Sequence, residues 1–338
     1  MKKIINSPIL DRRKFLQIIA IAGASGVGWY AGIRPSRKMK VVRRSQPMMG
    51  TVLNLIVYGT ERNTIEAALD ATIKRMLALE NRLSRFLPSS EVSQLNINGS
   101  IDNPGPDLCR VLKISHRVSQ QSGGAFDITV LPLVEINQQY HGDRKPDKAS
   151  LTTALGLVNY QGITITDKKI NFAKTGMGIT LDGVGKGYIV DQGVAELEKF
   201  GFNQIYVEAG GDLMVKGSKP HHKQWKIGIE NPRPATPAKL VILKTSNRAV
   251  ATSGDYMQAY NADFSRNHIV NPHTGFSPPE LASATITAPS VVLADALATA
   301  TMVMGSERSI KMLANMPGCE GYFIDKDLSH HQTRNFFG

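Results

Sequence analysis

The sequence predicts an α+β protein in which largely antiparallel sheets pack against a few helices. Short β-rich runs recur along the chain and are separated by Gly, Asn, Asp and Pro, as expected for strands joined by tight turns. The helical runs do not alternate with the strands in the order that a parallel sheet requires. Its 338 residues suffice for one large domain or two of ordinary size. No internal repeat interrupts this pattern.

Periodicity places the helices and strands in chain order. Residues 51–58 are β-rich and mostly apolar, and apolar residues then recur at helical spacing through 61–83. The second helix ends at Gly123-Gly124 and the third at Gly201, the residue type that commonly follows a helix. Helices are expected at 61–83, 108–121, 187–200, 295–304 and 306–315. Strands are expected at 51–58, 163–166, 169–172, 179–181, 204–208, 213–216, 226–229, 240–244, 249–252 and 321–324. Residues 89–92 are expected to form a short turn, and 133–160 a variable polar region.

The net charge of +12 raises the question of a nucleic-acid partner. Residues 1–40 hold nine basic side chains and one acidic one, a net charge of +8, which leaves +4 for the other 298 residues. The body therefore carries no Lys/Arg run dense enough to follow a phosphate backbone, and we expect no nucleic-acid partner. The two cysteines, Cys109 and Cys319, are too few for a disulfide framework or a cysteine metal site, and whether they pair stays open.

The first forty residues have the form of an export signal. Arg12-Arg13 precede Phe15-Leu16 and a charge-free stretch, 15–33, which resembles a twin-arginine signal. The alternative is an uncut transmembrane helix, since nineteen charge-free residues lie near the lower limit for spanning a bilayer. Either interpretation places the body, residues 41–338, in the periplasm or on the outer face of the cytoplasmic membrane. The N-terminal segment, 1–40, would be a signal and linker, or a membrane tether.

A glycine-rich segment, 176–187, invites two phosphate-binding interpretations. The P-loop spacing fails because Thr180 stands where Gly is required and Gly187 where Ser or Thr is required. The dinucleotide spacing fails because the glycines lie at 183, 185 and 187. The segment is therefore either a plain strand-to-helix turn or a turn whose free N–H groups receive a phosphate in another way.

Asp295 and Thr299 lie four residues apart, on one face of an expected helix. Two oxygen ligands without nitrogen or sulfur suit a hard cation such as Mg²⁺. The alternative is structural: an acid near the helix N-terminus and a Thr bonded to the carbonyl four residues earlier. His268, taken alone, is more often structural or exposed than catalytic.

Eight segments in a fixed order resemble the ApbE family, the FAD:protein FMN transferases, from about residue 49 to residue 324. These segments are MGT at 49–51, LSRF at 83–86 with SEVSQLN at 90–96, GAFDITV at 124–130, GVGKGY at 183–188, AGGD at 209–212, TSGDY at 252–256, HIVNPHTG at 268–275 and DALAT at 295–299. The resemblance implies an ApbE-like fold over 41–338, with the flavin site in a cleft between lobes.

The resemblance also implies roles for individual residues. The positions expected to lie against FAD are Met49, Phe86, Ala125, Phe126, Asp127, Thr180, Lys186 and Ile269. Many members have Asp where this chain has Thr180, so the nearest carboxylate is that of Asp182. A metal, Mg²⁺ in this family, would be held by the carbonyl of Gly183 and the side chains of Asp295 and Thr299. His268 would act as the base for the incoming hydroxyl, and Lys186 would add electrostatic stabilisation.

The reaction implied is Mg-dependent transfer of FMN from FAD to a Ser or Thr hydroxyl of an acceptor protein, an exported or membrane redox subunit, with release of AMP. Two alternatives remain open at this level. An FAD pyrophosphatase would use water in place of the acceptor hydroxyl and release free FMN and AMP. An exported flavin-binding protein without catalysis would need the FAD pocket and no metal.

Overall fold

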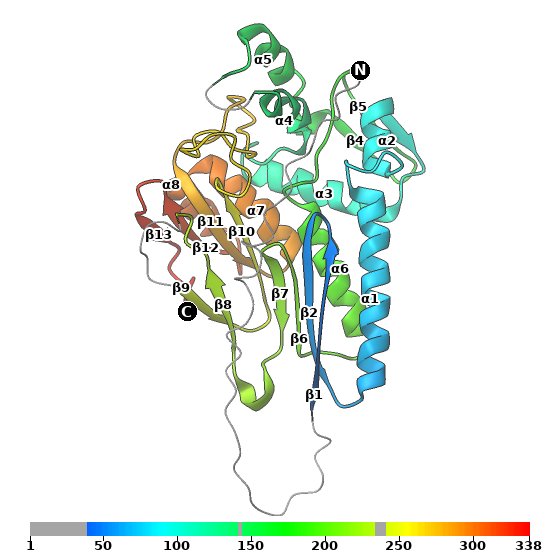
Figure 1. Ribbon diagram of the computed structural model, residues 1–338. Coiled ribbons are helices and arrows are strands. Elements are labelled where there is room, and N and C mark those ends of the chain that lie inside the picture. Colours follow the sequence, from blue (N-terminus) through cyan, green and yellow to red (C-terminus); the bar gives the residue numbers. More distant parts are fainter. Residues whose placement is uncertain (1–38, 141–143, 234–240) are drawn as a thin grey trace, which may run out of the picture. The chain divides into compact units, whose positions relative to one another are not determined.

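The computed structural model describes residues 39–140, 144–233 and 241–338, and the expected export signal lies outside them. Their main feature is an eight-stranded sheet in the order β1-β2-β6-β7-β10-β11-β12-β13, antiparallel throughout (Figure 1). These strands are β1 (Lys40–Met48), β2 (Thr51–Gly59), β6 (Ile205–Ala209), β7 (Asp212–Lys216), β10 (Arg248–Gly254), β11 (Leu281–Ala288), β12 (Glu320–Asp325) and β13 (His330–Gln332). The predicted α+β class with antiparallel sheets is confirmed.

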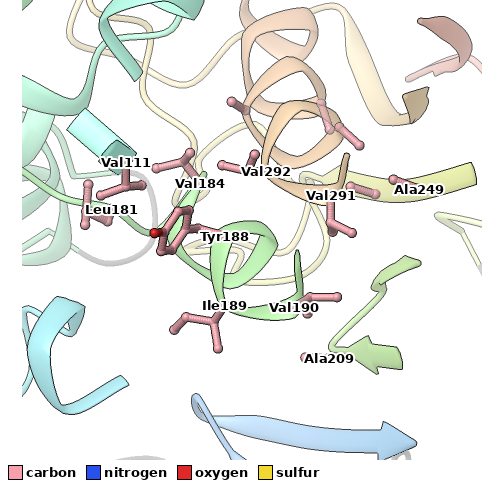
Figure 2. Packing of buried hydrophobic residues seen from close by; sticks show 14 of the residues in the cluster. Val111, Leu181, Val184, Tyr188, Ile189, Val190, Ala209, Ala249, Val291 and Val292 are labelled. Carbon is pink, nitrogen blue, oxygen red and sulfur yellow. The ribbon is translucent and has the colours of Figure 1, made fainter. Parts of the chain in front are cut away.

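Helices cover one face of this sheet, with α1 (Arg62–Leu83) alongside β1 and β2 and with α6 (Gly185–Lys199) and α7 (Val291–Met304) beside it (Figure 1). The apolar positions of α1 that predicted this helix, such as Ile65, Leu69 and Met76, are fully buried. Val184 and Tyr188 pack beside Val291 and Val292 in the core beneath the start of α6 (Figure 2). This core fixes the N-terminal ends of α6 and α7 against each other.

The opposite face carries a second, smaller core. The hairpin of β8 (Trp225–Ile229) and β9 (Val241–Thr245) packs on it through Trp225 and Leu243. Trp225 stacks on Tyr206 of β6, with ring centroids 5.6 Å apart. Both faces of the central strands are therefore covered, which explains why all eight residues of β11 are buried.

A three-stranded sheet and the remaining helices complete the body. The sheet has the order β3 (Ser100–Asp102), β5 (Lys169–Phe172), β4 (Ile163–Ile165), and α3 (Pro106–Gln121) packs near it. The expected turn at 89–92 is wrong, because Ser90 caps a helix, α2 (Glu91–Asn98), by accepting the N–H of Ser93 at 3.0 Å. The expected polar region 133–160 contains α4 (Leu131–Gln138) and α5 (Lys148–Leu155), which bury Leu133, Val134 and Ala154 together. Helix α8 (Ser306–Leu313) follows α7.

The strand expected at 179–181 is also wrong. The backbone of Ile179 bonds to a side chain instead: its N–H donates to Asn96 Oδ1 at 2.8 Å and its carbonyl accepts from Asn96 Nδ2 at 2.9 Å. A side-chain amide thus takes the place of a neighbouring strand. Cys109 and Cys319 are both buried and both free, so they do not pair. Within the described ranges, no helix has the length and apolar character needed to cross a membrane.

Candidate active site

The glycine-rich segment forms a turn that opens α6, not a P-loop. The N–H of Thr180 donates to the carbonyl of Ile128 at 2.8 Å, and Gly185 N–H closes the turn on Leu181 at 2.6 Å. Leu181 and Val184 are buried and anchor it in the core shown in Figure 2. The turn therefore holds its backbone in a fixed position at the N-terminal end of α6.

Helix α7 approaches this turn closely enough to exclude side chains between them. A Cβ on Gly187 would lie 2.5 Å from the carbonyl oxygen of Val291, and one on Gly183 would lie 2.7 Å from Thr299 Oγ1. The N–H of Gly187 donates to Asp295 Oδ2 at 3.0 Å. The backbone of the turn and the polar face of α7 thus meet, as the spacing of Asp295 and Thr299 requires.

Neither structural alternative for Asp295 and Thr299 describes what these side chains do. The N-terminus of α7 is capped from α6 by Asp191, whose carboxylate accepts the N–H groups of Val291 and Val292, each at 2.9 Å. Thr299 makes no bond to the carbonyl of Asp295, and its hydroxyl faces Ser253 Oγ at 3.4 Å. Asp295 and Thr299 are therefore available for a ligand beside Gly183.

Lys186 lies among carboxylates. Its ammonium group forms an ion pair with Asp212, which is 2% exposed and follows the β6–β7 turn. Burial lowers the pKa of Lys186, but the charges of Asp212 and Asp295 outweigh it and hold that pKa above the usual value. Burial, with the charge of Asp212, raises the pKa of Asp295 to about 7. The site is therefore a buried group of two carboxylates that share one lysine.

The oxygen atoms present fit a hard divalent cation. Asp295 uses Oδ2 for Gly187, while Oδ1 accepts no hydrogen bond from the described residues. Thr299 Oγ1 and the backbone of Gly183 lie against each other, and a cation here would relieve the burial of the Asp295 charge. Among the residues that the structure describes, no group of three His, Cys, Asp or Glu could hold a metal.

The charges of Asp182 and Lys186 both act on the His268 side chain, so His268 lies near the glycine-rich turn that carries these two residues. Its backbone N–H donates to the carbonyl of Gln258 at 3.0 Å, and its side-chain Nδ1 has no hydrogen-bond partner. Burial, opposed by Asp182 and helped by Lys186, lowers the pKa of the His268 imidazole to about 4. The side chain is therefore neutral at pH 7 and able to accept a proton.

Asp127 has a structural task. Its carboxylate accepts the N–H and hydroxyl of Thr129 at 2.7 and 2.6 Å and the N–H of Tyr160 at 3.0 Å. Ala125 and Phe126 beside it are buried. Because Ile128 binds Thr180, this segment is joined to the glycine-rich turn. Asp127 thus fixes the loop on which Ala125 and Phe126 stand.

Phe86 and Asp182 are linked by Arg85. Arg85 donates to Asp182 Oδ2 from Nε at 2.9 Å and from Nη2 at 2.8 Å, and its guanidinium lies 4.2 Å from the centre of the Phe86 ring. Phe86 is 68% exposed, so much of its side chain is accessible. Thr180 Oγ1 accepts the N–H of Asp182 at 3.1 Å and so shapes the turn. The pairing of Asp182 with Arg85 was not predicted from the sequence.

The last two residues expected against FAD, Met49 and Ile269, come from separate segments of the chain. Met49 and Gly50 both have positive φ, 54° and 69°, and form the two-residue turn between β1 and β2. The N–H of Met49 donates to Glu80 at 2.8 Å, and neighbouring Thr51 lies against the Gly210 turn that precedes Asp212. Ile269 follows His268 and is buried.

Gly183 lies against Thr299, and Lys186 forms an ion pair with Asp212. The charge of Asp295 also acts on Lys186, and the charge of Lys186 acts on His268. No role was predicted for Asp212 or Arg85 from the sequence, although both lie within segments that resemble the family, 209–212 and 83–86. Asp212 could have been found in the sequence from its position directly after Gly210 and Gly211, which have positive φ values of 63° and 97° in the structure.

The chain belongs to the ApbE family, whose model matches residues 49–323. It is 28% identical over 296 residues to the FAD:protein FMN transferase of Haemophilus influenzae, covering 82% of this chain and 84% of that protein. The structure resembles the flavin transferase ApbE from Vibrio cholerae with a TM-score of 0.77 and 26% identity, over 88% of this chain and 99% of that one. It also resembles the ApbE protein of Thermotoga maritima with a TM-score of 0.79 and 25% identity, over 88% of this chain and 100% of that one.

Proposed function

We propose that this protein transfers FMN from FAD to a Ser or Thr hydroxyl of an acceptor protein. The observation that carries the proposal is the convergence of Gly183, Asp295 and Thr299 beside Lys186. The relatives that match most of the chain bear the name FAD:protein FMN transferase, which agrees with this chemistry.

In this reaction the acceptor oxygen forms a bond to the FMN phosphorus, and the bond from that phosphorus to the bridging oxygen breaks. AMP leaves with the bridging oxygen, and the hydroxyl proton must be removed. His268 is neutral and has an unpaired Nδ1, so we assign it the removal of this proton. Lys186 lies where its positive charge can stabilise the charge that develops on the pyrophosphate.

The remaining residues bind and position FAD in this proposal. The exposed ring of Phe86 offers an aromatic face, and Met49 lies at the tip of a neighbouring hairpin. Ala125, Phe126 and Ile269 supply buried apolar surface, while Asp127 and Thr180 fix the loops that carry it. The carbonyl of Gly183 and the side chains of Asp295 and Thr299 would hold Mg²⁺, which when bound would supply Lewis-acid stabilisation of the phosphate oxygens.

We further propose that the protein acts in the periplasm or on the outer face of the cytoplasmic membrane. This proposal rests on Arg12-Arg13 and the charge-free stretch 15–33, which lie outside the described residues. An exported or membrane redox subunit with a Ser or Thr flavinylation motif would be the acceptor. Fractionation of cells that express the full chain, with Arg12-Arg13 changed to Lys-Lys as the matched variant, tests it: the variant should stay in the cytoplasm.

The proposed reaction is tested with the full chain, FAD, Mg²⁺ and an acceptor domain. We expect the intact mass of the acceptor to rise by one FMN and AMP to appear in equal amount. FMN given in place of FAD is the control, because it has no pyrophosphate to break. Release of free FMN and AMP at the same rate without acceptor would instead show a pyrophosphatase. FAD binding with neither AMP nor adduct would show a flavin-binding protein.

A further inference from the structure

A group of basic side chains covers the end of the sheet where β1 begins, and nothing in the proposed reaction uses it. These residues come from three segments: the start of β1, the turn between β7 and β8, and the outer side of the β8–β9 hairpin. We call them the basic surface, and they are Arg43, Lys219, Lys223, Lys226 and Lys244.

The basic charges lie close together without acidic partners. Lys219 and Lys223 face each other across a β-bridge, and burial together with the positive charges of Arg43 and Lys226 lowers the pKa of Lys219. Lys226 stands directly opposite Lys244 in the β8–β9 pairing, an arrangement of like charges that is unfavourable without a counter-charge. None of these five forms an ion pair with any residue in the described ranges.

Apolar side chains are exposed among these charges. Met39 and Val41 at the start of β1 are 46% and 37% exposed, and Ile242 on the hairpin is 43% exposed. Residues two apart along a strand share a face, so Val41 lies on the face of Arg43 and Ile242 on the face of Lys244. Basic and exposed apolar residues on one face are the combination that binds the interface of an anionic bilayer.

The connection of the chain favours a membrane over an acidic protein. The polypeptide enters the body at Met39, beside this surface, and only residues 34–38 separate it from the charge-free stretch 15–33. Five extended residues span at most roughly 18 Å, so an N-terminal segment held at a bilayer would keep the basic surface near it. Strand β1 then runs nine residues, roughly 30 Å, to the turn at Met49 in the candidate site.

We propose that the basic surface binds the headgroups of anionic phospholipids and holds the catalytic end of the sheet away from the bilayer. The inference stands on the charges and the entry point of the chain and does not depend on the transfer reaction. The length of β1, roughly 30 Å, would then separate the bilayer from the site and leave space for an acceptor domain to reach it.

Binding of the full chain to vesicles tests this proposal. The probes are phosphatidylcholine vesicles with and without phosphatidylglycerol, at low and at high salt. The variant carries Arg43→Gln, Lys223→Gln, Lys226→Gln and Lys244→Gln. The matched control carries Lys113→Gln, Lys168→Gln, Lys174→Gln and Lys311→Gln, four exposed lysines on other parts of the body. The N-terminal segment is the same in all three proteins, so differences between them report on the body.

We expect phosphatidylglycerol to strengthen binding of the unchanged chain, and each residue of the basic surface should raise the affinity by about fivefold. The basic-surface variant should lose at least tenfold of this gain and the control less than threefold, with equal circular dichroism and melting temperature for all. High salt should remove the difference. Equal losses in variant and control, or binding that ignores phosphatidylglycerol, would overturn the proposal. So would binding of polyglutamate by the basic surface without any phosphatidylglycerol dependence, which would indicate an acidic protein partner.

Discussion

Gly183 lies so close to Thr299 that a Cβ on the glycine would stand 2.7 Å from the threonine hydroxyl. The backbone of Gly183 has an ordinary negative φ, so the close approach, not the conformation, demands glycine here. The same contact brings the backbone of Gly183 against the Thr299 hydroxyl, on the helix that also carries Asp295.

Gly183→Ala should therefore reduce FMN transfer strongly while leaving the protein folded. The added methyl must displace the β-branched Thr299 side chain, which has little rotamer freedom in a helix, at a cost of about 1–3 kcal/mol in unfolding free energy. Transfer should fall at least tenfold, measured as acceptor adduct per minute. Gly185→Ala is the matched control, because its nearest neighbour would be Leu181 Cβ at 3.3 Å. Equal effects of the two substitutions would argue against a special role for the Gly183 contact.

Variants of the ion pair between Lys186 and Asp212 should affect stability and catalysis differently. Asp212→Asn leaves a half-buried lysine with one carboxylate fewer, so we expect a loss of about 1–3 kcal/mol in unfolding free energy and at least tenfold in transfer. The double variant Lys186→Gln/Asp212→Asn should regain most of the stability but none of the transfer. Denaturant unfolding and intact-mass kinetics measure the two quantities. Recovery of transfer in the double variant would show that the pair is only structural.

The pH dependence of transfer should lack the limb that an ordinary histidine produces. Because burial lowers the pKa of His268 to about 4, the imidazole stays neutral and able to accept a proton well below pH 6.5. At saturating Mg²⁺, kcat/KM should change less than threefold between pH 7.5 and 5.5 and fall only as the pH approaches 4. A tenfold decrease per pH unit beginning near 6.5 would contradict this assignment.

Asp191 should stabilise the protein through the N-terminus of α7. Removing both of its hydrogen bonds by Asp191→Ala should cost about 2 kcal/mol of unfolding free energy. Burial raises the pKa of Asp191 to about 6, above its usual value near 4, so the folded state retains a proton that the unfolded state has lost. The stabilisation from this proton is complete below about pH 4 and is lost as pH rises through 6.

The control for this effect is Asp191→Asn, which cannot titrate. The unfolding free energy of the unchanged chain, relative to this variant, should fall by about 2–3 kcal/mol between pH 4 and pH 7. A difference that stays constant over this range would show that Asp191 titrates alike in the folded and unfolded protein.

Local patterns predicted those elements whose burial has a clear period. The helix over 61–83 was predictable because one face of α1 is buried and the other is charged. Strand β11 was missed although apolar and hydroxyl residues alternate over 282–288, because small Ala, Ser and Thr side chains give this alternation little hydrophobic contrast and both faces are buried. Helices α4 and α5 are short, and their apolar residues become meaningful only where they pack on Val270, far away in sequence.

The candidate site shows the same division. The spacing of Asp295 and Thr299 predicted a shared helix face because four residues make about one helical turn. The partner of Lys186 could not be predicted, because Asp212 reaches it only through the pairing of β6 with β7 and the packing of α6 on that sheet. The lowered pKa of His268 likewise depends on burial that only the tertiary structure provides.

Asp295→Asn tests the central proposal most directly. Asn can still accept the N–H of Gly187 through its carbonyl oxygen, so the turn should keep its shape while the charge that would hold Mg²⁺ is removed. In the intact mass of an acceptor domain incubated with FAD and Mg²⁺, we expect the FMN adduct to form at least a hundredfold more slowly than with the unchanged chain. Asp191→Asn, another buried carboxylate of the α6–α7 contact, should transfer within threefold of the unchanged chain. FMN transfer by Asp295→Asn at the unchanged rate would contradict the proposed site.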